Sequence, residues 1–147
     1  MTRKPVLSAY AAIALLTIGA APPPPSELTL QLNGLRNAKG VVHVCLTSDA
    51  ARFLDCQKVA GSVGRTLPAG QAGRIALGRV PAGTYALLVV HDENRNGKLD
   101  MMLGIPREGF GFSNNPAMKP RAPRWEEIRF ALVPGTVTQT IRIRYVL

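Results

Sequence analysis

Residues 92–100 carry oxygen-bearing side chains whose spacing suits the binding of a hard cation. Carboxylate and amide side chains occupy alternate positions, and Gly97 stands where a calcium loop bends sharply. The second half of that pattern is missing, because Leu103 stands where a bidentate glutamate would complete the coordination. If this loop binds Ca²⁺, we expect the binding to be weak, with a Kd on the order of 0.1 to 1 mM. The candidate ligands are the side chains, or for the lysine the carbonyl, of Asp92, Asn94, Asn96, Lys98 and Asp100.

The same residues also fit a loop that binds no metal. Asp and Asn side chains close turns by accepting hydrogen bonds from nearby backbone amides. Asn96-Gly97 is a pair that favours positive φ. If a cation is bound, Glu108 or a backbone carbonyl from the following segment would replace the missing ligand. The sequence leaves two alternatives open, a weakly bound cation and a self-capped turn.

A second set of polar and aromatic residues predicts a binding surface beside the loop. Exposed rings next to polar groups, with Trp125 added, would suit a carbohydrate-binding module. A hydrolase would instead need His91 within hydrogen-bond reach of Ser113 or Glu108, and Ser113 lies in no G-x-S-x-G elbow. We take a non-enzymatic binding or structural role as the leading hypothesis, with no catalytic residue assigned. The candidate surface residues are His91, Glu108, Phe110, Phe112, Ser113 and Asn114.

The two cysteines, Cys45 and Cys56, are predicted to form a disulfide if the chain is exported. A zinc site would need two further ligands, and His43 is the only candidate nearby. A redox pair would normally show C-x-x-C spacing. Closing this loop of about a dozen residues would stabilise the fold by roughly 3 kcal/mol.

The N-terminal residues 1–21 have the features of a secretory signal. A basic start precedes an apolar run that is shorter than a membrane-spanning helix, and small residues follow. Residues 22–26 form a proline-rich spacer, and a single domain is expected over residues 27–147. The protein is thus expected in the periplasm or outside the cell, with no transmembrane segment after cleavage.

Removing Arg3 and Lys4 with the signal lowers the formal net charge from +9 to +7, because that segment contains no acidic residue. The remaining basic residues are scattered and form no run of five. Nucleic acid is therefore not the expected partner. An envelope polysaccharide or protein is the expected kind of partner.

Short apolar or alternating segments separated by Gly and Pro turns predict six or seven strands and no long helix. The continuous apolar run from Tyr85 to Val90 predicts a central strand covered on both faces. The first two strands are expected to pair as a hairpin. Because the strands are many and short and no long helix is expected, the predicted fold is a single all-β sandwich. The expected strands are 28–32, 41–46, 74–80, 85–90, 126–132 and 137–145.

Three connecting segments have weaker patterns. Residues 48–56 predict a short helical turn with Phe53 and Leu54 directed toward the core. Residues 60–73 are rich in small residues and predict a loop or an edge region. Residues 101–123 show no regular period, so we expect a long ordered excursion anchored by apolar side chains.

The segments His91–Asp100 and Leu103–Asn115 resemble the signature of the DUF2141 family of exported bacterial proteins. The approach Pro81–Ala86 and a closing strand that ends in Tyr145 are similar to the same family. The resemblance implies a sandwich of the transthyretin-like, immunoglobulin-like or carboxypeptidase-regulatory type. It implies no catalytic residues, and residues 121–125 depart from the family's usual Gly-Pro-Pro-Ser-Phe stretch.

Overall fold

The computed structural model describes residues 21–22 and 24–147, and these form strands with a few short helices. The predicted signal sequence, residues 1–21, lies outside the described residues except for Ala21. In chain order the elements are β1 (Ser26–Asn33), β2 (Val41–Thr47), η1 (Phe53–Lys58), β3 (Val63–Pro68), η2 (Ala69–Gln71), β4 (Arg74–Val80), β5 (Gly83–Asp92), β6 (Met101–Met102), β7 (Ile105–Pro106), β8 (Gly109–Phe112), α1 (Trp125–Ile128), β9 (Phe130–Leu132) and β10 (Gly135–Arg142).

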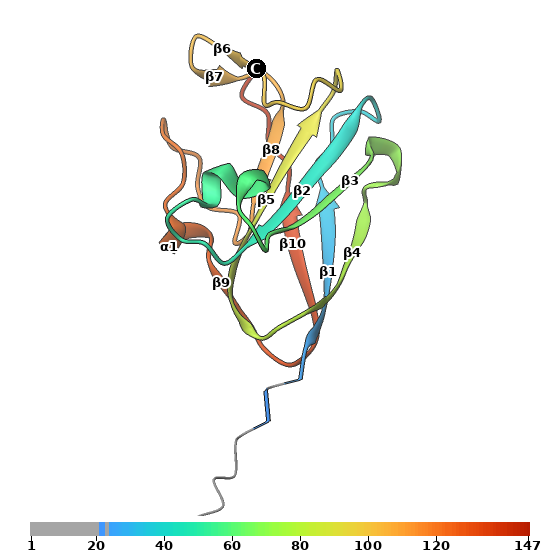
Figure 1. Cartoon of the computed structure of the whole chain (residues 1–147). Helices are drawn as coiled ribbons and strands as arrows, with labels where there is room; N and C mark the ends of the chain where they lie inside the picture. The colour runs from blue at the N-terminus through green and yellow to red at the C-terminus, as the bar shows by residue number, and fades with distance from the viewer. Residues whose placement is uncertain (1–20, 23) are drawn as a thin grey trace, which may run out of the picture.

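Two sheets face each other and enclose the main hydrophobic core (Figure 1). The smaller sheet has the order β10-β1-β4, in which β1 runs parallel to β10 and antiparallel to β4. The larger sheet has the order β3-β2-β5-β8, and β9 pairs with the start of β5. Leu30 of β1 and Leu87 of β5 are both fully buried in this core. The predicted all-β sandwich is confirmed.

The burial of each strand follows its hydrophobic pattern. In β1, Leu28, Leu30 and Leu32 are buried, while the residues between them are more exposed. Strand β5 lies between β2 and β8, so it is central in its sheet, as predicted. Its continuous apolar run fits this position because both of its faces are covered.

The predicted hairpin of β1 with β2 is wrong, because these strands belong to different sheets. Their apolar faces meet across the core, where Leu30 and Val44 both belong to the main cluster. The connection over residues 34–40 is long enough to carry the chain from one sheet to the other. Alternating patterns look the same whether two strands pair edge to edge or pack face to face, so the sequence pattern does not distinguish the two arrangements.

The strand predicted over residues 126–132 is correct only in its second half, β9. The first half is helical, and α1 begins where the Glu127 carboxylate accepts a hydrogen bond from the backbone amide of Arg124 at 2.7 Å. Ile128, Phe130 and Leu132 are all buried, as predicted. None of the helices in the described part of the chain exceeds six residues, and none can cross a membrane.

The predicted disulfide between Cys45 and Cys56 is present, with an S–S distance of 2.01 Å. It joins β2 to η1, which begins later than the helical turn that we expected. Phe53 is buried as predicted, but Leu54 is 53% exposed, so its predicted direction is wrong. Successive side chains on a 3-10 helix point about 120° apart, so the two neighbours do not share a face.

Residues 60–73, expected as a loop or edge region, contain β3, which is the edge strand beside β2.

Residues 101–123, expected as an excursion without regular elements, contain three strands. β6 and β7 form a hairpin, and β8 joins the larger sheet. Glycines permit this: a Cβ on Gly109 would lie 2.5 Å from Cε1 of Tyr145, and one on Gly111 would lie 2.6 Å from Cγ2 of Ile141. The glycines face the core, so the alternation of a strand places Phe110 and Phe112 on the outer face.

Candidate functional site

Asp92 is fully buried at the end of β5, and its carboxylate holds the loop that follows. Its Oδ1 accepts a hydrogen bond from the amide of Asn96 at 3.1 Å, and its Oδ2 accepts one from the amide of Gly97 at 2.7 Å. Oδ2 also lies 3.1 Å from Nε2 of His43 on the neighbouring strand β2. His43 was not predicted as part of the site, since its partner is set by the register of β2 against β5.

The other polar side chains of the loop bond to one another and to the loop backbone. Oδ1 of Asn94 accepts from the amide of Asn96 at 3.0 Å, and Oδ1 of Asn96 accepts from the amide of Lys98 at 2.9 Å. The two asparagine Nδ2 groups donate to separate oxygens of Asp100, at 2.6 and 2.7 Å. Gly97 has a φ of 76°, which supplies the bend predicted there.

Glu108 closes the loop from the far side of the β6–β7 hairpin. It is 4% exposed; its Oε1 accepts from the amide of Glu93 at 3.0 Å and its Oε2 from the amide of Asp100 at 3.1 Å. The amide of Arg107 donates to the carbonyl of Asp100 at 2.9 Å. We call Asp92 and Glu108 the carboxylate clamp, because together they tie both ends of residues 92–100 to the start of β8.

The environment of Asp92 favours its charged form. Burial is the largest single influence and raises the Asp92 pKa, but the hydrogen bonds from Gly97, His43 and Asn96 outweigh it. The net result is a pKa below the ordinary value for aspartate. The carboxylate therefore stays ionised at neutral pH and keeps its acceptor role.

The contacts of residues 92–100 are those of a self-capped turn. The clamp carboxylates already accept backbone amides, and the Asp100 carboxylate accepts side-chain amides. Within residues 21–22 and 24–147, His, Cys, Asp and Glu side chains form no group of three or more that could hold a metal ion. Calcium binding by Asp92, Asn94, Asn96, Lys98 and Asp100 stays a prediction.

His91 is fully buried and belongs to a different set of contacts from the one expected. Its Nε2 lies 2.7 Å from the carbonyl oxygen of Lys39, which can only accept, so this nitrogen carries a proton. Its Nδ1 lies 2.7 Å from the hydroxyl of Tyr145. Burial raises the pKa of Tyr145. The guanidinium carbon of Arg36 lies 4.3 Å from the centroid of the Tyr145 ring. His91 therefore links the clamp end of β5 to the C-terminal segment.

Ser113 and Asn114 connect β8 to the region around α1. The buried Ser113 hydroxyl accepts from the amide of Leu87 at 3.0 Å and donates to the carbonyl of Ile128. The side chain of Asn114 donates to the carbonyl of Arg129 at 2.8 Å. These contacts hold the end of β8 in place.

The structure does not bring the predicted polar surface residues together. His91, Glu108 and Ser113 are all buried, and each is bonded to different partners. Trp125 packs against Phe53, with ring centroids 5.8 Å apart, in a second small cluster against which Phe112 also packs. The contacts required by a hydrolase with a His91–Ser113 or His91–Glu108 pair are therefore not formed here. Of the predicted surface set, Asn114 is exposed and Phe110 and Phe112 are half-buried.

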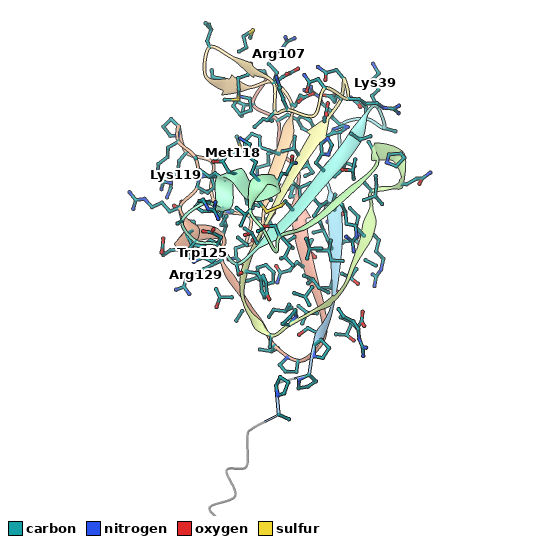
Figure 2. The ribbon with its side chains drawn as sticks, viewed as in Figure 1. Lys39, Arg107, Met118, Lys119, Trp125 and Arg129 are labelled. Atoms are coloured by element: carbon teal, nitrogen blue, oxygen red, sulfur yellow. A yellow bond between two sulfur atoms is a disulfide. The ribbon has the colours of Figure 1, made fainter. Side chains whose placement is uncertain are left out.

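Phe110 and Phe112 lie beside an apolar groove of about 730 Å³. Its walls come from the β6–β7 hairpin and from residues 115–123, and Figure 2 shows Met118 and Lys119 on the latter segment, before Trp125. The centroids of the Phe110 and Phe112 rings lie 5.8 Å apart, and both residues are half-buried. The apolar side chains in the lining include Leu54, Met101, Ile105, Phe110, Phe112 and Met118.

Sequence reasoning missed most of this groove. Arg142 and Arg144 also line it, and they alternate on the chain with the buried Ile141 and Ile143. That alternation was visible and predicts that the arginines face outward. Their place beside Phe110 follows from a bridge between Phe110 and Arg144, which no local pattern indicates.

Comparison with known proteins gives a family but no characterised relative. No curated protein and no solved structure matches the chain. The sequence profile of the family described as "Uncharacterized protein conserved in bacteria (DUF2141)" matches residues 30–140, which span β1 to β10 and include the clamp and β8. The match covers well over half of the chain, which therefore belongs to the DUF2141 family.

Proposed function

We propose that this protein is an exported, non-enzymatic binding protein that takes the apolar part of a small molecule into the groove beside β8. The observation that carries the proposal is the groove itself. Its volume of about 730 Å³ falls within the range usual for small-molecule sites, and its lining is largely apolar. Exposed apolar surface of this kind usually marks a contact with something other than water.

The carboxylate clamp supports this proposal as a structural device. Asp92 and Glu108 fix the base of the β6–β7 hairpin, which forms one wall of the groove. Ser113 and Asn114 fix the other end of β8 near α1. Both ends of the strand that carries Phe110 and Phe112 are thus held by hydrogen bonds, so the groove is formed before a ligand arrives.

Export is supported by two features. The signal-like residues 1–21 precede the domain, and the Cys45–Cys56 disulfide belongs to proteins of oxidising compartments. We propose that the protein acts in the periplasm or outside the cell. Small apolar molecules dissolve poorly in such aqueous spaces, so a protein that binds them there has a clear physical use.

The loop of residues 92–100 has a structural role in this proposal without a bound cation. Because its carboxylates already accept amide hydrogens, we expect the melting temperature to stay the same in about 10 mM calcium. A rise in melting temperature with calcium, together with heat released on titration, would show that the cation-bound alternative is the correct one.

The groove is tested by titration with N-phenyl-1-naphthylamine, a dye whose fluorescence rises in apolar surroundings. We expect saturable binding to the purified protein. Met118→Glu, which places a carboxylate in the lining, should weaken binding about 10-fold or more. Val133→Glu is the matched control, because Val133 is 58% exposed, Met118 is 46% exposed, and Val133 does not line the groove. Equal dye binding by both variants would refute the proposal.

A further inference from the structure

We propose that the ligand of this groove is a single-chain amphiphile with an anionic head, such as a long-chain carboxylate, and that Arg142 receives the head. This inference rests on the proposed function, because it assigns a chemical class to the molecule that fills the groove.

The charged lining is strongly cationic. The lining contains four basic residues and one acidic residue, Glu127. Lys119 and Arg121 both pair with Glu127, at 2.6 and 2.8 Å, and these contacts hold the pKa of Glu127 well below its usual range. Their positive charge is therefore already balanced in part by a neighbouring carboxylate.

Arg144 is occupied by the backbone of the groove wall. Its two terminal nitrogens donate to the carbonyls of Pro116 and Asn115, at 3.0 and 3.3 Å. The backbone of Arg144 also exchanges two hydrogen bonds with Phe110, at 2.9 and 3.0 Å. Arg144 thus positions the wall against β8, and no acidic side chain of the described residues forms an ion pair with it.

Arg142 differs from the other three cations. Arg142 lines the groove, and within the described residues its guanidinium makes no hydrogen bond and no ion pair. Its backbone is fixed: the amide of Arg142 donates to Oδ1 of Asn115 at 2.7 Å, and Nδ2 of Asn115 donates to the carbonyl of Thr140 at 2.8 Å. Its neighbours Ile141 and Ile143 are buried, which turns Arg142 outward.

A guanidinium with all of its donors available beside an apolar surface has a specific chemical complement. It forms paired, charge-assisted hydrogen bonds with a carboxylate or phosphate-type oxyanion. The apolar floor at Phe110, Phe112 and Met118 is suited to an acyl chain. An anionic head on an apolar tail satisfies both parts of the groove at once.

The shape of the groove favours one free molecule over a membrane surface. Residues 115–123 and the β6–β7 hairpin form walls around Phe110 and Phe112, so these rings lie in a recess and not on a projecting face. A recess of this size accommodates a single ligand. We therefore infer that the groove binds a single dispersed amphiphile.

Three probes with the same tail and different heads test this inference by calorimetry: decanoate, decanol and decyltrimethylammonium. The two ionic probes are kept below their micelle-forming concentrations and decanol below its solubility limit. We expect decanoate to bind about 10-fold or more tightly than decanol, and the cationic probe to bind weakest. Arg142→Ala should remove most of the preference for decanoate, and Arg142→Lys should retain part of it. Arg74→Ala, at an exposed arginine in β4 outside the groove, is the control and should change nothing.

The outcomes separate the two proposals. If none of the probes binds, both the groove function and this inference fail. If all three bind equally, the groove function stands and the anionic head is refuted. If decanoate is preferred equally by the Arg142→Ala variant, with an unchanged melting temperature, the role of Arg142 is refuted. Sedimentation with phosphatidylglycerol vesicles, in the absence of decanoate binding, would identify a membrane surface instead and overturn the inference.

Discussion

Asp92 shows how one buried carboxylate can fix a loop of nine residues. Its two oxygens accept the amides of Asn96 and Gly97 and contact His43. Replacing the buried Asp92 with Ala removes the acceptor of the Gly97 amide and the partner of His43 Nε2, while the Asn96 amide keeps only Oδ1 of Asn94. We therefore expect a loss of about 1 to 3 kcal/mol in the free energy of unfolding. Urea denaturation measures it.

The matched control is Asp55→Ala. Asp55 is exposed, and its carboxylate forms an ion pair with Lys58 at 3.5 Å, so its loss should cost less than about 0.5 kcal/mol. Equal denaturation midpoints for the Asp92→Ala variant and the unmodified protein would show that the clamp does not stabilise the fold.

The clamp also predicts a dependence of stability on pH. Since the pKa of folded Asp92 lies below its unfolded value of about 3.9, its contribution is fully present above that value and is lost as pH falls toward the folded pKa. Glu93, whose pKa is lowered chiefly by the Arg36 side chain, acts in the same direction. Unfolding free energies measured from pH 6 down to about pH 2 should fall less steeply for Asp92→Asn than for the unmodified protein. Parallel curves would contradict this assignment.

Leu103 is an exposed residue in an unfavourable backbone conformation. It is 97% exposed and has a φ of 52°, at the tip of the β6–β7 hairpin. Left-handed backbone costs leucine roughly 1 to 2 kcal/mol, and Asn tolerates it better. We expect Leu103→Asn to raise the free energy of unfolding by about 0.5 to 1 kcal/mol. Met102→Asn, in the same hairpin, is the control, and an equal gain there would rule out the backbone explanation.

Among single residues, the sequence indicated which side chains of the loop could hydrogen-bond to its backbone, and it left cation binding open. Asp, Asn and Gly report their turn-forming chemistry locally, so the self-capped alternative could be described in advance. The partners of His91 could not, because one lies on the connection after β1 and the other, Tyr145, lies near the end of the chain. Contacts between residues so distant in sequence depend on the assembled fold.

Strand β8 is the element on which the groove depends, and its alternation of glycine and phenylalanine is the reason. A methyl group on Gly111 would meet Ile141 and the Arg142 carbonyl, at 2.6 and 3.1 Å. We expect Gly111→Ala to cost about 1 to 3 kcal/mol in the free energy of unfolding. Gly73→Ala is the control, because nothing lies within 4 Å of a Cβ there. Thermal melting of both variants decides the question, and an undisturbed Gly111→Ala protein would show that β8 does not need this close approach.

Elements with strong local patterns were predicted, and pairings between elements were not. The apolar run of β5 and the alternation of β1 and β10 report burial residue by residue. The hairpin expected for β1 and β2 was wrong, because a strand's pattern shows which face is buried and not which strand lies beside it. β8 was missed because its core-facing positions are glycines, which carry no hydrophobic signal.

The groove is a property of the whole molecule. Its lining ranges from Leu54 in η1 to Val146 near the C-terminus, with β8 and residues 115–123 between them. Phe110 and Phe112 could be selected from sequence as candidate binding residues, but Arg142 could not be placed beside them without the bridge between β8 and the end of β10. Sequence patterns thus indicated part of the site, and the sandwich assembled it.

Three of the four methionines, Met101, Met102 and Met118, allow the central claim to be tested directly. Met101 and Met118 line the groove, while Met102 does not. With ¹³C-labelled methionine methyl groups, titration with decanoate should shift the Met101 and Met118 signals in proportion to saturation, give cross-peaks from both to the decanoate chain, and leave Met102 nearly unchanged. Equal small shifts of all three signals, or no cross-peak from Met118 at saturating decanoate, would contradict the account.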